Sequence, residues 1–261
     1  MSKVILREKI LTIGAPGSGK SYSGLTIARC FPDNRFFIMD SDDAVPRMLA
    51  TDFADLKNVT ILPCVEWPDY EKAVKTVEKD SKPGDWLMID LITQAWAAVQ
   101  NYFVETIYAE SLSELLMRMR AAMKAGDTQL KTLEGWNDWR PIKALYNDNL
   151  MRRIKYKISA HVYATASVRA PRDSDERDIK EMFAGGKMPE GEKHLGHEFF
   201  TILNAQHLRD GWTMSTIKDI GRKLMDRQPM PNFGLGYVIA VAGLKPKKAK
   251  KKKDKKEGTS D

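Results

Sequence analysis

An octapeptide near the start of the chain, Gly14-Ala15-Pro16-Gly17-Ser18-Gly19-Lys20-Ser21, constrains the fold more than any other feature. It matches G-x-x-x-x-G-K-[ST] at every fixed position, which a chain of this length and average composition does by chance in about one case in a hundred. The apolar run before it, residues 9–13, predicts a strand, and residues 20–30 predict a helix. Glycines let backbone N–H groups wrap a phosphate at a helix N-terminus, whose dipole favours anions. The octapeptide therefore predicts a phosphate-binding loop in an α/β fold.

The same motif assigns chemistry to its last two residues. Lys20 is expected to reach the β- and γ-phosphates of a nucleotide, and the Ser21 hydroxyl to ligate Mg²⁺. Such a site needs an acid beside the metal. Asp90 follows the apolar residues 86–89, as the acid of a Walker B strand does. We therefore expect Ser21 and Asp90 to be the metal ligands.

A second strand is expected at 35–40, and its last residue, Asp40, is followed by Asp42 and Asp43. Hydrolysis requires a group that orients or deprotonates water near the γ-phosphate. Asp42 or Asp43 would serve, and the alternative is a solvated acidic turn or a helix N-cap.

The remaining body alternates apolar runs with amphipathic stretches, as α/β domains do. Further strands are expected at 58–62, 85–90 and 159–168, and helices at 69–79, 91–125 and 141–157. The helical stretch 91–125 divides into two pieces, because Ser111 and Glu114 have capping-box spacing and Gly126 is a stop signal. Residues 199–208 and 213–220 predict a hairpin across 209–211, and residues 237–241 a last strand.

The positive charge is concentrated in a tail. The chain has 42 Lys and Arg against 35 Asp and Glu, a net charge of +7. Residues 245–261 hold nine Lys and three acids, which leaves residues 1–244 close to neutral. A segment so poor in apolar residues cannot build a core. We expect one domain over residues 1–244 and a disordered Lys-rich tail over 245–261.

Several protein classes are excluded by what the sequence contains. No apolar run is long enough to span a bilayer, and the charged first eight residues are not a signal peptide. Two cysteines, Cys30 and Cys64, cannot form a disulfide framework or a Cys-rich zinc site. We expect a reduced cytoplasmic protein that does not contact membranes.

The loop and the Asp90 strand together resemble the compact RecA/RadA-like P-loop ATPases encoded by phages, a group that includes single-strand annealing and recombination proteins. The resemblance covers roughly residues 8–243, and Met88-Ile89-Asp90-Leu91-Ile92-Thr93 resembles the family's Walker B segment. It implies a RecA-like fold, a mostly parallel sheet flanked by helices with a C-terminal antiparallel hairpin. An extra strand would lie between the loop strand and the Walker B strand. ATP and Mg²⁺ would be bound, in the host cell cytoplasm if the protein is phage-encoded.

The resemblance also assigns roles to single residues. The family's catalytic Glu stands two residues after the Asp that ends the second strand, and here Asp42, one methylene shorter, has that place. Residues 160–167 resemble the strand that senses the γ-phosphate, so Thr165 or Ser167 would do so, unless these hydroxyls are satisfied within the sheet. Residues 216–222 resemble a strand whose Lys and Arg reach a neighbouring subunit. Lys218 and Arg222 would then act across the interfaces of a homo-oligomer, and otherwise they are surface charges.

Single-stranded DNA is the partner that the resemblance implies. In RecA-like folds, the loops before and after the sensor strand contact it, which here are about 126–140 and 169–197. The first loop mixes cations with stacking rings, in Lys131, Trp136, Trp139 and Arg140. The second has more acidic than basic residues and gives no support. The tail could bind a phosphate backbone, an acidic protein, or only aid solubility.

These observations together favour an ATPase that acts on single-stranded DNA in recombination, annealing or repair, with other replication or recombination proteins as further partners. Its catalytic residues would be Lys20, Asp42, Asp90, Lys218 and Arg222. Three alternatives stay open: an ATP-dependent motor or loader for packaging or a helicase, a nucleotide or small-molecule kinase with an Arg-rich lid in 169–193, and an adaptor that binds ATP and hardly hydrolyses it. His194 and His197 fall short of a zinc set, and the four histidines show no triad pattern.

Overall fold

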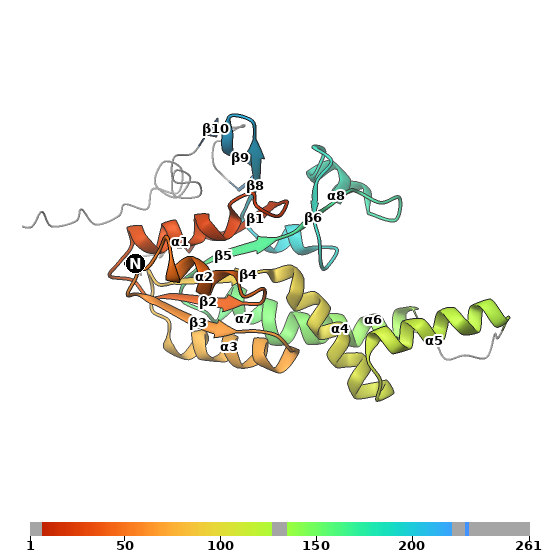
Figure 1. The fold of residues 1–261 in the computed structure, drawn as a ribbon. Helices are drawn as coiled ribbons and strands as arrows, with labels where there is room; N and C mark the ends of the chain where they lie inside the picture. The colour runs from red at the N-terminus through yellow and green to blue at the C-terminus, as the bar shows by residue number, and fades with distance from the viewer. Residues whose placement is uncertain (1–6, 127–134, 221–227, 230–261) are drawn as a thin grey trace, which may run out of the picture.

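The computed structural model describes residues 7–126, 135–220 and 228–229. Within these ranges, eight strands form one sheet in the order β10-β9-β8-β1-β5-β4-β2-β3, with helices on both faces (Figure 1). Neighbours from β8 to β3 are parallel, and β9 and β10 are antiparallel. The predicted α/β class, with a mostly parallel sheet and an antiparallel C-terminal hairpin, is confirmed. The strands are β1 (Lys9–Gly14), β2 (Phe36–Asp40), β3 (Val59–Pro63), β4 (Trp86–Asp90), β5 (His161–Ala166), β8 (Thr201–Leu208), β9 (Gly211–Asp219) and β10 (Gln228–Pro229).

The strand order brings the site residues to one edge of the sheet. β1, which leads into the Gly-rich loop, is separated from β4 by β5, so the extra strand expected from the resemblance is present. β2 pairs with β4 in a register that sets Asp40 opposite Asp90. Because parallel strands end at the same edge, the loop and these two carboxylates meet there.

Two cores cover the two faces of the sheet. Successive strand residues alternate between them: Ile10 packs with one core and Leu11 with the other, as the period of two in a strand requires. α1 (Lys20–Cys30) and α2 (Ala44–Ala50) cover the face of Ile10. α3 (Trp67–Asp80), α4 (Ile92–Tyr108), α6 (Gly135–Tyr146), the π-helical turn η1 (Asn147–Met151) and α7 (Arg152–Tyr156) cover the other.

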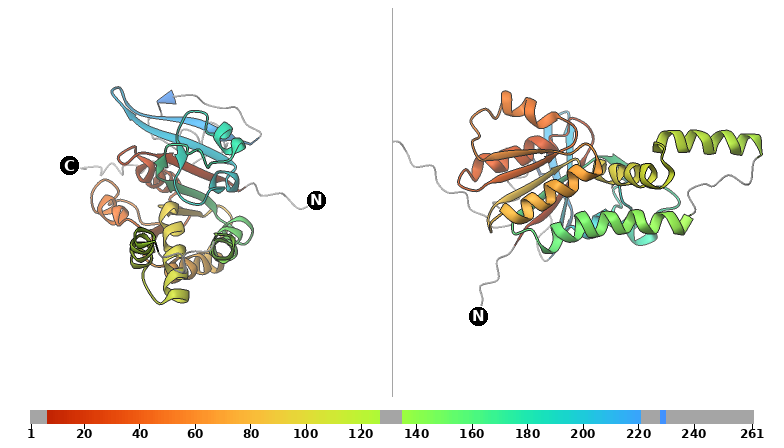
Figure 2. Two further views of the ribbon diagram at one scale, coloured as in Figure 1. Left: turned by 90° about the vertical axis from the view of Figure 1, so that its right-hand side faces the viewer. Right: turned by 90° about the horizontal axis from the view of Figure 1, so that it is seen from below.

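A helical arm leaves the body beyond α4. α5 (Leu112–Ala125) points away from the sheet (Figures 1 and 2) and buries only Leu115 fully. Its ends are those predicted: Ser111 and Glu114 form a capping box, and Gly126 ends the helix with φ 76°. The predicted division of 91–125 into two helices is confirmed, with the break at residues 109–111.

Two helices differ from the predictions. α6 begins at Gly135 rather than at Pro141, which lies inside the helix. Tertiary packing outweighs the proline because Ile142 and Tyr146 are buried in the core. α2 has no counterpart among the predicted helices, because seven residues are too short a stretch to show a helical period.

Other predictions concern irregular or undescribed parts. The charged segment 169–197 forms short elements, namely β6 (Val168–Arg169), α8 (Arg177–Met182), β7 (Met188–Pro189) and the 3₁₀ turn η2 (Leu195–Glu198). The predicted strand at 237–241 and the tail 245–261 lie outside the described residues, so the domain boundaries stay predictions. In the described ranges, no helix combines the length and apolar character needed to cross a membrane.

Candidate functional site

The Gly-rich loop connects the buried β1 to α1, and two of its glycines are required by the backbone. A Cβ on Gly14 would collide with the Ser18 side chain and lie 2.5 Å from the carbonyl oxygen of Ala205 on β8. Gly19 caps α1 with φ 86°, in the left-handed region that glycine tolerates. The loop therefore keeps its path because these positions carry no side chain.

Lys20 lies against the loop that it follows. Its Nζ donates hydrogen bonds to the carbonyl oxygens of Gly14, at 2.8 Å, and Ala15, at 3.0 Å. Burial lowers the pKa of the ammonium group, while the negative charges of Asp90 and Asp42 oppose that shift. The Tyr163 hydroxyl of β5 donates to the Lys20 carbonyl at 3.0 Å and ties α1 to the sheet.

Asp90 ends β4 and is fully buried. One oxygen, Oδ1, accepts a hydrogen bond from the hydroxyl of Thr165 on β5. Burial raises the pKa of the carboxyl, and the hydroxyls of Thr165 and Ser21 partly oppose this. Among the described residues, Asp90 Oδ2 is buried without a hydrogen-bond partner.

Two further acids lie beside Asp90. Carboxylate oxygens of Asp40, Asp42 and Asp90 are all within 4.8 Å of one another. Burial and the charges of Asp90 and Asp42 raise the pKa of Asp40 to about 6. Like-charged groups this close disfavour joint ionisation, and a bound cation would relieve it.

This donor set fits Mg²⁺, the metal expected from the sequence. Mg²⁺ takes oxygen ligands, most often one or two carboxylates together with phosphate oxygens. Asp90 Oδ2 and Asp40 Oδ1 are both buried acceptors without a hydrogen-bond donor in the described part of the chain. Ser21 and Asp90 are the residues that would hold the ion.

The two candidates for the catalytic acid are placed differently. Asp42 lines the cavity beside Lys20 and Ser21, and its Oδ1 accepts a hydrogen bond from the Ala44 backbone N–H at 3.3 Å. Asp43, the residue before α2, is exposed with φ 57° and is not among the cavity residues. Ser41 fixes the turn, because its Oγ accepts from the Leu91 N–H at 2.7 Å and donates to the Asp90 carbonyl at 2.9 Å.

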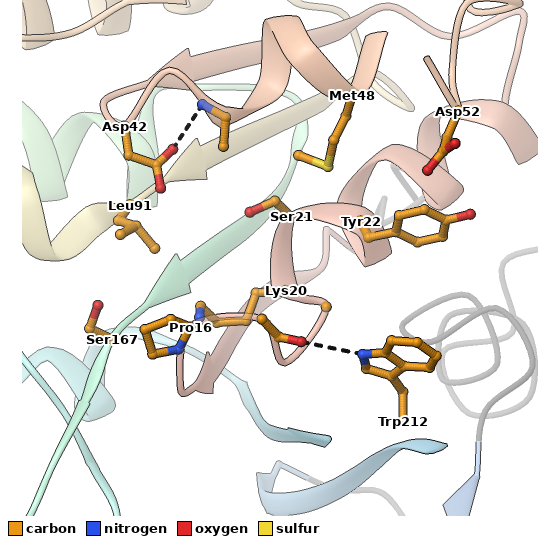
Figure 3. Close-up of a pocket in the computed structure, with 13 residues that line it drawn as sticks. Pro16, Lys20, Ser21, Tyr22, Asp42, Met48, Asp52, Leu91, Ser167 and Trp212 are labelled. Carbon is orange, nitrogen blue, oxygen red and sulfur yellow. Dashed lines mark hydrogen bonds between the residues drawn. The ribbon is translucent and has the colours of Figure 1, made fainter. Parts of the chain in front are cut away.

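A cavity of 810 Å³ opens over the loop, a size suited to a nucleotide-sized ligand. Figure 3 shows Lys20 and Ser21 near its middle, Asp42 and Ser167 toward one end, and Trp212 toward the other. Of the acids predicted from sequence, Asp42 therefore borders the same space as the loop. The cavity is lined by Pro16, Gly17, Gly19, Lys20, Ser21, Tyr22, Asp42, Ala44, Met48, Asp52, Leu91, Ser167 and Trp212.

The two hydroxyls considered as phosphate sensors have different surroundings. Thr165 is fully buried and its hydroxyl is bonded to Asp90. Ser167 lines the cavity, and its backbone N–H donates to the hydroxyl of Thr93 on α4 at 3.1 Å. Ser167 therefore has access to a ligand, whereas Thr165 acts on Asp90.

The residues expected to reach a neighbouring subunit are not both described. Lys218, on β9, is half-buried and its Nζ donates to the Gly196 carbonyl of the same chain at 3.0 Å. Burial lowers its pKa. Arg222 lies outside the described residues, and both assignments stay predictions.

The first loop expected to contact DNA is only partly described. Trp139 is 37 % exposed and stacks on Trp96 at 6.3 Å, and Arg140 is exposed. Lys131 and the side chain of Trp136 lie outside the described part. In the second loop, Arg169 is committed to Asp175 by two hydrogen bonds of 2.7 and 2.8 Å.

Four cavity residues, Tyr22, Met48, Asp52 and Trp212, had no role in the sequence prediction. Tyr22 directly follows the loop motif, a signal that could have been used. Trp212 is brought in by the β8–β9 hairpin, and its Nε1 donates to the Gly17 carbonyl at 3.3 Å. Nothing local in the sequence indicates that contact.

The sequence matches the family model described as an AAA domain over residues 7–233. The chain belongs to the AAA domain family. This membership indicates a nucleotide-hydrolysing ATPase and confirms the coarser part of the resemblance, a P-loop ATPase with a strand inserted between loop and Walker B strand. Phage origin and an annealing role stay predictions.

No curated protein matches the chain. A solved structure described as the crystal structure of the RadB recombinase is similar to it at 10 % identity and a TM-score of 0.47, over 84 % of this chain and 85 % of that chain.

Proposed function

We propose that this AAA domain binds and hydrolyses ATP with Mg²⁺, and acts on single-stranded DNA in recombination, annealing or repair. The observation that carries the ATPase part is that the loop, Ser21 and Asp42 line one cavity, and that the buried carboxylate of Asp90 lies within 4.8 Å of the Asp42 carboxylate. The DNA part is supported by the sequence resemblance and by the surface of the arm.

The reaction follows from the placement of these groups. Lys20 offsets negative charge on the β- and γ-phosphates, and Asp42 orients water and accepts its proton. The water oxygen bonds to the γ-phosphorus while the bond from that phosphorus to the bridging oxygen breaks, which gives ADP and phosphate. Mg²⁺ held by Ser21 and Asp90 would neutralise phosphate charge.

The ATPase proposal is tested by Lys20→Ala with Lys79→Ala as a matched control. Lys79 is an exposed residue of α3, away from the cavity. We expect Lys20→Ala to reduce turnover at least about 100-fold, since it removes a charge that stabilises the transition state, and Lys79→Ala to leave it within about twofold. Turnover that survives Lys20→Ala would contradict the proposal.

The arm offers a surface suited to single-stranded DNA. Met117, Arg120 and Lys124 are exposed on α5 at spacings that place them on one helix face. Cations with adaptable apolar side chains suit a strand's backbone and bases. α4 starts two residues after Asp90, and Thr93 in its first turn contacts Ser167. The arm is thereby connected to the cavity.

DNA binding is tested with a labelled oligonucleotide and two double variants. Arg120→Ala/Lys124→Ala is expected to weaken binding about 5- to 20-fold and to flatten the salt dependence, because two phosphate contacts are lost. Lys72→Ala/Lys79→Ala on α3 removes the same charge elsewhere and is expected to bind as wild type. If DNA neither binds nor stimulates turnover at low salt, the recombination role fails.

Assembly and the tail are part of the same proposal. We propose a homo-oligomer in which Lys218 or Arg222 reaches a neighbour's nucleotide, and a tail, residues 245–261, that adds non-specific DNA affinity. A chain ending at residue 244 should keep its basal turnover and lose salt-sensitive affinity. Turnover per chain that does not change with protein concentration would count against interfacial catalysis.

A second candidate is a nucleotide-gated adaptor that hydrolyses ATP slowly. It is favoured by Asp42, which is shorter than Glu and bonded to Ala44 N–H. Asp42→Glu separates the two: a large gain in turnover supports the adaptor, and an unchanged or lower rate supports Asp42 as the working base.

A further inference from the structure

The cavity has two chemically different ends. Asp42, Leu91 and Ser167 lie on one side of Lys20 and Ser21, and Tyr22, Asp52 and Trp212 lie on the other (Figure 3). The first end holds the groups suited to a terminal phosphate. The second end is bordered by two large aromatic side chains.

The direction of a bound nucleotide follows from this division, given the proposed function. Hydrolysis takes place at the γ-phosphate, so that phosphate must face Asp42 and Asp90. The nucleoside is at the opposite end of the triphosphate. It must therefore extend toward Tyr22, Asp52 and Trp212.

Both rings at that end are held in place. Trp212 donates from Nε1 to the Gly17 carbonyl at 3.3 Å and stacks on His207, with ring centroids 4.5 Å apart and planes 8° apart. Tyr22, in the first turn of α1, packs edge-on against Phe53 at 4.8 Å. They remain 48 % and 37 % exposed, respectively, and line the cavity. Rings fixed in this way lose little entropy when a ligand packs on them.

Asp52 adds a carboxyl group to the aromatic end of the cavity. An ionised carboxylate only accepts hydrogen bonds. It therefore matches a base that presents N–H donors, such as the exocyclic amino group of adenine, and disfavours an edge made of acceptors.

We propose that Tyr22, Asp52 and Trp212 form the nucleobase subsite, in which the two rings pack against the base and Asp52 accepts a hydrogen bond from its exocyclic amino group. This subsite rests on the proposed ATPase function. It makes Trp212, on the late hairpin, a nucleobase-binding residue of a site whose phosphate loop lies near the N-terminus.

The test measures equilibrium binding to the full chain with Mg²⁺. Three probes are compared: ATP, purine riboside triphosphate, which lacks the amino group, and inorganic tripolyphosphate, which lacks the nucleoside. Base stacking is worth about 1–3 kcal/mol, so Trp212→Ala should weaken ATP binding about 5- to 150-fold. It should leave tripolyphosphate within about twofold, and Trp212→Phe should restore most of the ATP affinity. The control is Tyr156→Ala, an exposed aromatic residue of α7.

Asp52→Ala provides a second, independent measurement at an exposed position. It should weaken the binding of ATP and leave the binding of purine riboside triphosphate unchanged, so that the variant binds the two probes with similar affinity. This variant decides the matter if Trp212→Ala does not fold.

Failure of the subsite and failure of the proposed ATPase function give different results. If Trp212→Ala weakens tripolyphosphate as much as ATP, the indole supports the loop through Gly17 and the subsite is refuted while the ATPase function stands. Equal affinity of the wild type for ATP and tripolyphosphate refutes it as well. If neither ATP nor tripolyphosphate binds the wild-type protein, the proposed function itself fails.

Discussion

Substitution of Thr165 tests how the carboxyl group of Asp90 is held in place. The Thr165 hydroxyl donates to Asp90 Oδ1 and lies 3.3 Å from the Ile89 carbonyl oxygen, and the residue is fully buried on β5. Thr165→Val removes this donor and keeps the shape of the side chain. The substitution removes the donor to Asp90 Oδ1 and leaves Ser21 as the neighbouring hydroxyl beside the buried carboxylate.

The expected loss of free energy of unfolding is that of one hydrogen bond to a buried carboxylate. A hydrogen bond to a charged group contributes about 1.5–3 kcal/mol, and an unpaired buried acceptor carries its full desolvation penalty. We expect Thr165→Val to lower the free energy of unfolding by about 2–3 kcal/mol, which moves the urea midpoint by about 1 M.

The matched control is the register partner of Thr165 on the adjacent strand. Thr12 lies opposite Thr165 on β1 and is also fully buried, but its hydroxyl neighbours the uncharged hydroxyl of Tyr163 rather than the carboxyl group of Asp90. Thr12→Val should therefore lower the free energy of unfolding by no more than about 0.5–1.5 kcal/mol, the contribution of a hydrogen bond between uncharged groups.

The assay is urea unfolding of both variants and the wild type at pH 7.5 without nucleotide or divalent cation. Equal midpoints for the two Val variants would refute the reasoning, since both remove one buried hydroxyl and only one removes a partner of Asp90.

Three further substitutions test the surroundings. Asp175→Asn should lower the free energy of unfolding by about 2–3 kcal/mol, because the guanidinium of Arg169, 16 % exposed, loses a bidentate partner; thermal unfolding measures this, and an unchanged midpoint would contradict it. Asn58→Asp should lose at least about 2 kcal/mol, because the Asn58 amide donates to three backbone carbonyls that a carboxylate would repel; Asn58→Ala losing more than Asn58→Asp would argue against repulsion. Burial lowers the pKa of His161 below its usual 6.5, so stability should be complete above pH 6.5 and fall at lower pH by up to about 1.4 kcal/mol per unit; His161→Gln should flatten that slope, and an equal slope in both proteins would exclude His161 as its origin.

Local signals were sufficient for the phosphate loop. The octapeptide, the apolar run before it and the helix after it are contiguous, and the structure places β1, the loop and α1 as predicted. Asp40, Asp42 and Asp90 come together because parallel strands end at one edge, which the strand-end acids indicated. These parts depend on short-range geometry and on the period of the strands.

The rest of the site depends on contacts between distant segments. Trp212 reaches Gly17 across 195 positions, and Thr165 reaches Asp90 across 75. No spacing in the sequence encodes such pairs, because they follow from the order of strands in the sheet. α6 shows the same limit for a local rule: Pro141 indicated a helix start, and packing of Ile142 and Tyr146 extended the helix through it.

The central position of β1 has a consequence for biosynthesis. Its two neighbours are supplied by residues 161–166 and 201–205, so both of its pairings are long-range. A nascent chain that has emerged only to residue 160 contains β2, β3 and β4 and neither partner of β1. Long-range parallel pairing is slow and leaves strand edges exposed until it is complete. The loop is therefore among the first segments to be translated, whereas the strand that leads into it gains both of its neighbours only after Ala205 has been added.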